Sequence, residues 1–163
     1  MPSLSDTSHE HHGVINEHVD RLPGIADSIG DVDAATLRDS FLPEHAFIAG
    51  RLIRHMTAVE SSLYAPLERL MEGRHSMAPM RREHEEVVRL VDSLGDFAAK
   101  LQDGTLEKED GIGLRRALYR LHSIVKVHLA EEELYLGVLD HNLSEAEKDE
   151  ITRALVHACE QPL

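Results

Sequence analysis

The sequence has few of the residues that build β-sheets, disulfide scaffolds or membrane spans. Aromatic residues make up 4% of the 163 residues and tryptophan is absent, which disfavours a β-sheet protein. The single cysteine, Cys159, excludes an internal disulfide and favours a reducing cytoplasm as the location. No apolar run approaches the roughly 20 residues that a membrane-spanning helix needs. The N-terminus lacks the basic start and apolar stretch of a signal peptide, so we do not expect secretion.

Positive charge is also scarce. The 17 Lys and Arg residues face 30 Asp and Glu residues, which gives a formal net charge of −13. This balance argues against nucleic acid and against an anionic membrane surface as partners, because both require a basic protein surface. The remaining composition, 42% hydrophobic and 29% charged, is typical of a globular protein, and the length predicts one domain over residues 1–163.

The apolar residues recur at helical spacing along most of the chain. This periodicity predicts helices at 9–29, from 36 or 41 to 71, at 77–101 and at 114–142, with a polar loop at 102–113. Ser144 with Glu147 three residues later forms a capping-box pattern that predicts a short helix at 144–158. We therefore expect an all-α fold, an antiparallel up-down four-helix bundle with a short C-terminal helix.

Prolines and glycines predict irregularities inside two of these helices. Pro23 and Gly24 predict a kink in the first helix, and Pro66 a bend near the end of the second. Pro43 leaves the start of the second helix open between Thr36 and Phe41. Gly73 is expected to end that helix.

Histidine is abundant, with twelve residues, and the helical positions of several are unusual. In the stretch VKVHLAEEELYLG, His128 and Glu132 lie one turn apart on the face that carries Leu121 and Val125. Each of the other three helices also places histidine on or beside its apolar face: His11 and His18 on the first, His55 on the second and His84 on the third.

Buried imidazole or carboxylate groups are costly unless they are paired. Each histidine could be satisfied locally, and His128 with Glu132 could be a structural ion pair. Four helices that each contribute such a group favour one shared polar centre, a metal site inside the bundle. His18 matches the level of His55 if the second helix begins at Pro43; His11 or His12 matches it if that helix begins near Thr36.

Four stretches of the chain resemble bacterial hemerythrin-like proteins, the HHE cation-binding family: NEHVDRL, FIAGRLIRHMTAVESSLYAPL, MRREHEEVVRL and LHSIVKVHLAEEELYL. The resemblance covers residues 10–140 and implies a four-helix bundle with two non-haem iron ions joined by an oxo or hydroxo bridge. The metal ligands that it implies are His18, His55, Glu60, His84, His128 and Glu132.

The chain departs from the family pattern at two positions. Val59 stands where the second helix often carries its first acidic residue, and Val88 stands where a second histidine of the third helix is expected. The coordination positions left open could be filled by water or by a further side chain, the candidates being Tyr64, Tyr135, His45 and His122. A ferritin-like centre built from E-x-x-H motifs is a weak alternative, since that motif occurs only at Glu72 to His75.

The resemblance implies chemistry with dioxygen, peroxide or nitric oxide, so the expected partner is a small oxidant or a diatomic gas. An oxygen-rich ligand set favours redox turnover over reversible oxygen binding. We therefore expect catalase-like decomposition of hydrogen peroxide in a stress response. Three alternatives stay open: a non-enzymatic oxygen-binding protein, an iron- or oxygen-sensing module, and a structural or zinc-binding bundle without redox activity. The sequence indicates no protein partner.

Overall fold

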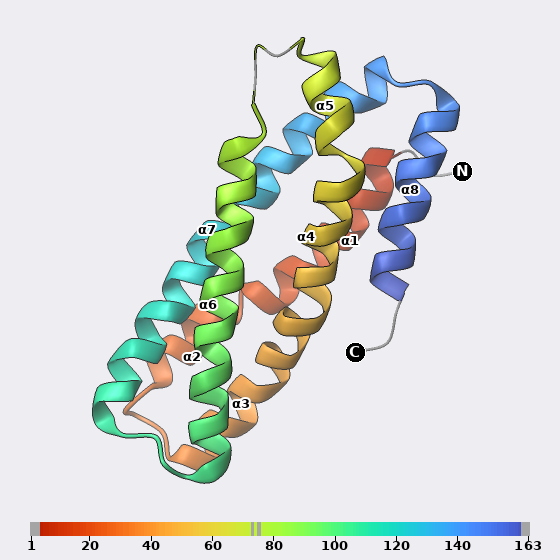
Figure 1. The fold of residues 1–163 in the computed structure, drawn as a ribbon. Coiled ribbons are helices and arrows are strands. Elements are labelled where there is room, and N and C mark those ends of the chain that lie inside the picture. Colours follow the sequence, from red (N-terminus) through yellow and green to blue (C-terminus); the bar gives the residue numbers. More distant parts are fainter. Residues whose placement is uncertain (1–3, 73, 75, 161–163) are drawn as a thin grey trace.

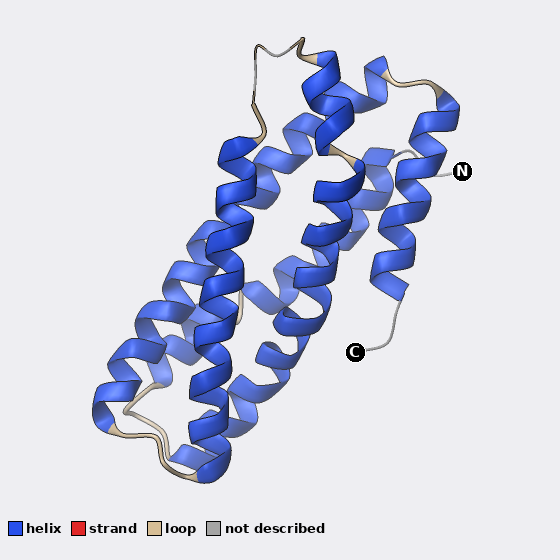
Figure 2. Cartoon of the chain, viewed as in Figure 1, coloured by secondary structure: helices blue, strands red, loops and turns tan. Residues whose placement is uncertain are grey.

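The computed structural model describes residues 4–72, 74 and 76–160, and the regular secondary structure of this part is helical (Figures 1 and 2). The helices are α1 (Leu4–Val19), α2 (Leu22–Ser28), α3 (Ala34–Phe47), the π-helix η1 (Ile48–Leu52), α4 (Ile53–Ser62), α5 (Tyr64–Leu70), α6 (Ala78–Asp103), α7 (Lys108–Asn142) and α8 (Glu145–Glu160). None of the described helices combines the length and apolarity needed to cross a membrane.

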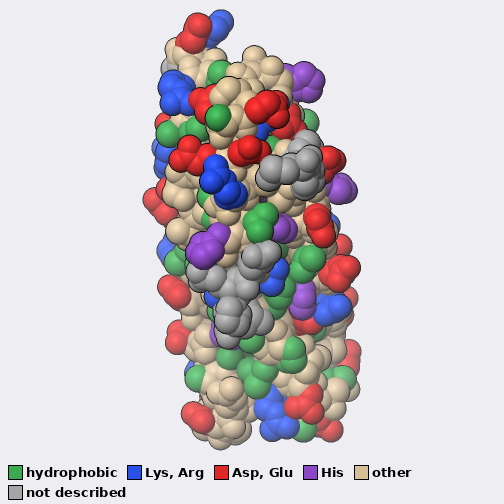
Figure 3. Space-filling model, turned by 90° about the vertical axis from the view of Figure 1, so that its right-hand side faces the viewer, with side chains coloured by type: hydrophobic (Ala, Val, Ile, Leu, Met, Phe, Trp, Pro, Cys, Tyr) green, Lys and Arg blue, Asp and Glu red, His purple; other side chains and the backbone are tan. Residues whose placement is uncertain are grey.

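The long helical segments run side by side (Figure 1). The two longest helices, α6 and α7, pack against each other; α1 and α2 pack against α7, and α3 packs against α6. The last helix, α8, folds back against α1 and α4. Acidic and basic side chains are interspersed over the face shown in Figure 3.

Side-chain caps fix where several helices begin. The Asp33 carboxylate accepts the Thr36 N–H at 2.7 Å, so α3 begins at Ala34. The predicted capping box of Ser144 and Glu147 is confirmed, because each residue bonds the backbone N–H of the other.

The first predicted helix is divided in two and begins earlier than expected. Its first part, α1, begins at Leu4 because Leu4, Thr7 and Ser8 are buried in the protein. The break falls at 20–21, before the predicted kink, and Pro23 lies in the first turn of α2. Proline fits there because the first backbone N–H groups of a helix need no intrahelical acceptor.

The second predicted helix comprises four consecutive elements, α3, η1, α4 and α5. It begins at the earlier of the two expected starts, and Pro43 lies inside α3. The predicted bend near Pro66 is a break at Leu63, the residue between α4 and α5. Its expected end at Gly73 lies outside the described residues.

The fourth long helix starts at Lys108, six residues before the predicted start at 114. Gly111 and Gly113, which belong to the predicted loop at 102–113, lie inside this helix and allow close packing. A Cβ atom on Gly111 would lie 3.1 Å from Ile29, and one on Gly113 would lie 2.9 Å from Phe97. The capping box of Glu107 and Asp110 starts the helix ahead of both glycines.

The apolar core is divided into two clusters. One cluster includes Ile15, Leu52 and Leu129, and the other includes Leu4 and Leu136. On α1, α6 and α7 a buried polar residue lies between the residues of one cluster and those of the other: His12, His84 and Glu132. On α4, buried His55 lies next to Met56, the last residue of the first cluster on that helix. The fold therefore contains a polar layer between two apolar cores.

Candidate metal centre

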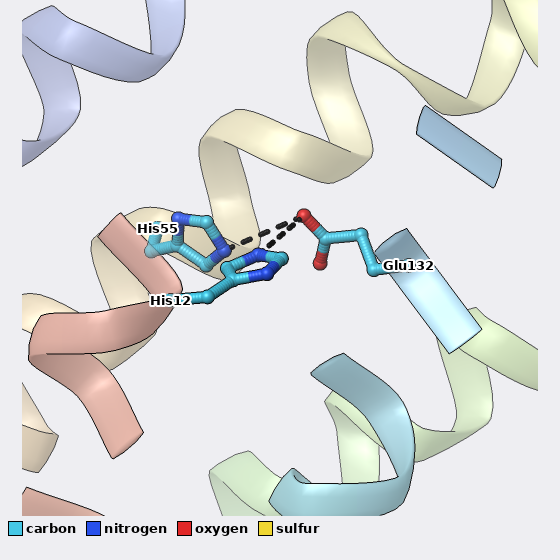
Figure 4. Close-up of side chains that lie close together, drawn as sticks. All are labelled: His12, His55 and Glu132. Carbon is cyan, nitrogen blue, oxygen red and sulfur yellow. Dashed lines mark hydrogen bonds and ion pairs between the residues drawn. The ribbon is translucent and has the colours of Figure 1, made fainter. Parts of the chain in front are cut away.

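Three side chains from three helices converge in the polar layer: His12 of α1, His55 of α4 and Glu132 of α7 (Figure 4). The Nε2 atoms of His12 and His55 lie 3.1 and 3.5 Å from Oε1 of Glu132. One ligand atom of each residue lies within 4.8 Å of the others, and all three residues are buried. Two imidazoles and one carboxylate at this separation can hold a metal ion.

The polar atoms of this group are incompletely paired. Within the described residues, three buried atoms of this group have no hydrogen-bond partner: the two ring nitrogens of His55 and Oε2 of Glu132. Burial alone would raise the pKa of Glu132, but His55 and His12 outweigh it and hold that pKa well below its usual range. The second oxygen of this buried carboxylate makes no hydrogen bond, and His55 contacts the carboxylate only through the 3.5 Å ion pair, so a cation here would bring the missing partner.

The Glu132 carboxylate also affects the pKa of His12. Burial opposes its charged form, but the hydrogen bonds and charges of Glu132 and Glu133 outweigh burial and raise the pKa of His12. Its Nδ1 lies 3.3 Å from Glu133 and its Nε2 3.1 Å from Glu132, so both ring nitrogens donate to carboxylates. Without a metal, the His12 cation therefore offsets the charge of Glu132.

A second group of donors adjoins the first. The Nε2 atoms of His84 and His128 lie only 2.9 Å apart, and the Tyr64 hydroxyl lies 3.0 Å from Nε2 of His84. Oε2 of Glu132 lies 3.7 Å from Nε2 of His128. Glu132 thus presents one oxygen to His12 and His55 and the other to the second group.

Outer carboxylates fix the tautomers of this second pair of histidines. Nδ1 of His84 donates to Glu60 at 2.9 Å, and Nδ1 of His128 donates to Glu83 at 2.7 Å. Because carboxylates only accept, both Nδ1 atoms carry protons, so each ring in its neutral form turns an Nε2 lone pair toward the other ring. Burial lowers the pKa of His84 against the opposing hydrogen bond with Glu60, which favours the neutral ring. Two lone pairs 2.9 Å apart repel unless a proton or a cation lies between them.

Tyr64 lies inside the centre with its proton in place. Burial raises the pKa of its phenol, and the nearby charges of Glu132 and Glu60 add to the effect. The hydroxyl can donate to Nε2 of His84, and the phenolate oxygen could serve as a metal ligand.

The structure brings four of the six predicted ligands into the centre: His55, His84, His128 and Glu132. His18 lies elsewhere: its Nδ1 pairs with Glu44 at 2.6 Å, and its ring stacks on Phe47. His12, one of the two alternatives considered for the first helix, takes the place expected for His18. The reason is the start of α3 at Ala34, which sets the level of His55 opposite His12.

Glu60 lies next to the centre but outside its inner donors. Its carboxylate accepts from the outer nitrogen of His84, and its side chain is 41% exposed. This position suits a residue that orients a ligand better than it suits a bridge between two metals. The Glu72–His75 alternative is not tested, because His75 lies outside the described residues.

Of the further candidates, Tyr64 contacts a histidine of the centre, His84. His45 packs beside Phe41 and Gly95, and His122 lies 3.5 Å from Asp20. Tyr135 packs against the second apolar cluster.

Sequence reasoning missed the outer carboxylates Glu83 and Glu133. Glu83 precedes His84 in the chain yet bonds His128 on the neighbouring helix, so spacing along one helix could not reveal it. Glu133 follows Glu132 and lies at the edge of the centre, where it contacts both His9 and His12. The sequence did carry a signal: acidic residues cluster beside His84 in REHEE and after His128 in HLAEEE.

Comparison with known proteins gives one match. Searches of curated proteins and of solved structures find none. The model of the hemerythrin HHE cation-binding domain matches residues 3–157, which is nearly the whole chain and includes every residue of the centre. Together with the buried His and Glu donors, this match shows that the chain belongs to the hemerythrin HHE cation-binding family.

Proposed function

We propose that this chain is a non-haem di-iron protein that reacts with small oxidants, above all by decomposing hydrogen peroxide. The observation that carries the proposal is the position of Glu132 between two groups of inward-facing donors. One group consists of His12 and His55, and the other of His84, His128 and Tyr64. The paired long helices would form an antiparallel four-helix bundle around this centre, with α8 added outside.

The donor types support iron. Two imidazoles and one carboxylate with further positions open are the ligand set of many non-haem iron enzymes. The Tyr64 phenol adds a hard oxygen donor to the second group, which suits ferric iron. Manganese and zinc accept similar ligands, so the metal must be measured. When bound, a pair of redox-active ions would supply the two-electron chemistry by which one hydrogen peroxide molecule is oxidised to dioxygen and a second is reduced to water.

The chain's own side chains prepare this centre. Glu60 and Glu83 hold the protons on Nδ1 of His84 and His128, so that both Nε2 atoms are free to bind metal. The two apolar clusters exclude water on either side of the polar layer. The single cysteine and the family match over residues 3–157 support the further proposal of a single domain that works in a reducing cytoplasm.

The test combines metal content with peroxide consumption. Iron-loaded wild type should bind close to two irons per chain and consume hydrogen peroxide. His128→Ala should bind less iron and lose turnover, whereas His122→Ala, a histidine outside the centre, should match wild type.

Each other outcome has a definite meaning. Full iron loading of His128→Ala would refute the assigned centre. Full loading of wild type without peroxide consumption would refute the enzymatic proposal and leave oxygen binding or sensing as the function.

A further inference from the structure

An open pocket lies between α4 and α6 and reaches the candidate centre. Its volume is about 470 Å³, and its lining includes His84 of the centre together with Glu60. The two helices contact each other in this region and run side by side in Figure 1. The lining also includes apolar residues, with Met56 from α4 and Val88 from α6.

The pocket approaches one half of the centre. His84 is part of its lining, whereas His12 and His55 are each 1% exposed and lie in the other half. The two groups of donors are therefore unequal in access. A molecule that enters between α4 and α6 meets His84 of the second group first, beside Glu60.

The charged groups around the pocket balance each other. Arg81 and Arg89 are matched by Glu60 and Glu85. Arg81 is also held in place: it bonds Glu68 at 2.8 Å and lies 5.3 Å above the centre of the Tyr64 ring. A lining with two charges of each sign has no strong preference for anions or cations, which suits small uncharged molecules.

Val88 lines the pocket one helical turn after His84. It is 40% exposed, which leaves room for a larger side chain without repacking the core.

We propose that this pocket is the entry route for small uncharged ligands, such as hydrogen peroxide or nitric oxide, and that it leads to the His84–His128 half of the centre. The inference rests on the proposed function, since it needs metal in the centre. Val88 is then the residue whose size sets the rate of entry.

The experiment measures nitric oxide binding to iron(II)-loaded protein by rapid-mixing absorption, with metal content determined in parallel. Val88→Trp should keep the iron content of wild type and slow nitric oxide association by about tenfold, because a narrowed route limits entry. Val127→Trp, at a 55% exposed position on α7, is the matched control and should bind at the wild-type rate. Val88→Ala should bind faster than wild type.

The outcomes separate this inference from the proposed function. Absence of iron from wild type would refute both. Iron-loaded Val88→Trp and Val88→Ala with wild-type association rates would refute the entry route alone. If Val88→Trp fails to fold, Val88→Ala decides: an unchanged rate overturns the proposal, and a faster rate supports it.

Discussion

At the scale of single residues, Glu132 is a buried carboxylate beside two imidazoles. Its side chain is 2% exposed, one oxygen faces His12 and His55, and the other lacks a hydrogen-bond partner within the described residues. An isolated carboxylate in such a place would take up a proton. The neighbouring imidazoles keep it charged, and a bound cation would do so more effectively.

Replacing Glu132 tests its shared position directly. Glu132→Gln keeps the size of the side chain but removes the negative charge that both groups of donors share. We expect the metal content to fall to half of the wild-type value or less, measured by elemental analysis after loading and desalting. Glu131→Gln, its neighbour on α7, is the control and should load fully; wild-type metal content in Glu132→Gln would contradict the assignment.

Replacing an outer carboxylate should lower the metal affinity, but by less than replacing a metal ligand. Glu83→Gln removes the charged acceptor for Nδ1 of His128, so we expect metal affinity to fall by about 10- to 100-fold. Competition with a chelator of known affinity measures the change. Glu85→Gln, an exposed residue on the same helix, should leave the affinity unchanged. Equal affinities in the two variants would show that Glu83 does not orient His128.

At the scale of the helices, irregular turns flank the residues that α4 and α5 bring to the centre. The π-helix η1 lies just before His55, and the break at Leu63 lies just before Tyr64. A π-turn holds one extra residue inside an otherwise α-helical run. Removing that residue should restore an ordinary helix and keep the direction of the side chains that follow.

A pair of single-residue deletions tests this reasoning. Deletion of the exposed Ala49 within η1 should preserve metal binding. Deletion of Thr57 within α4 should abolish most of it, because Glu60 and Tyr64 would be turned by about 100° relative to His55. Metal analysis and helical circular dichroism measure both variants. Loss of metal in the Ala49 deletion, with helicity retained, would mean that the π-turn itself is needed to place His55.

The positions of residues along the long axis of the packed helices explain which ligands could be predicted from the sequence. Periodicity showed which residues face inward, and His55, His84, His128 and Glu132 do meet. The first-helix ligand depended on where α3 starts, since six residues of helix amount to about 9 Å. The cap of Asp33 decides that start, and with it the choice of His12 over His18.

At the scale of the whole molecule, the polar layer divides the apolar core in two. The all-helical fold was predictable because amphipathic periodicity extends over most of the chain. The contacts of Glu83 and Glu133 were not, since they depend on how neighbouring helices face each other. A metal bound in this layer would contribute to stability, because it would neutralise charge and occupy lone pairs in the middle of the fold.

Removal of metal should therefore destabilise the entire protein. A ligand that binds only the folded state at 100 times its dissociation constant adds about 2.7 kcal/mol to the free energy of unfolding. We expect thermal unfolding monitored by circular dichroism to occur at a clearly lower temperature after chelation and to recover when iron is restored. An unchanged midpoint would show that the polar layer is stable without a metal.

The central claim, two irons held around Glu132, is tested most directly by metal analysis and an absorption spectrum of protein purified without added metal. We predict close to two irons per chain and near-ultraviolet charge-transfer bands from a bridged ferric pair. Zinc, or no metal in a cooperatively folded protein, would contradict the account and leave the core histidines with a structural role.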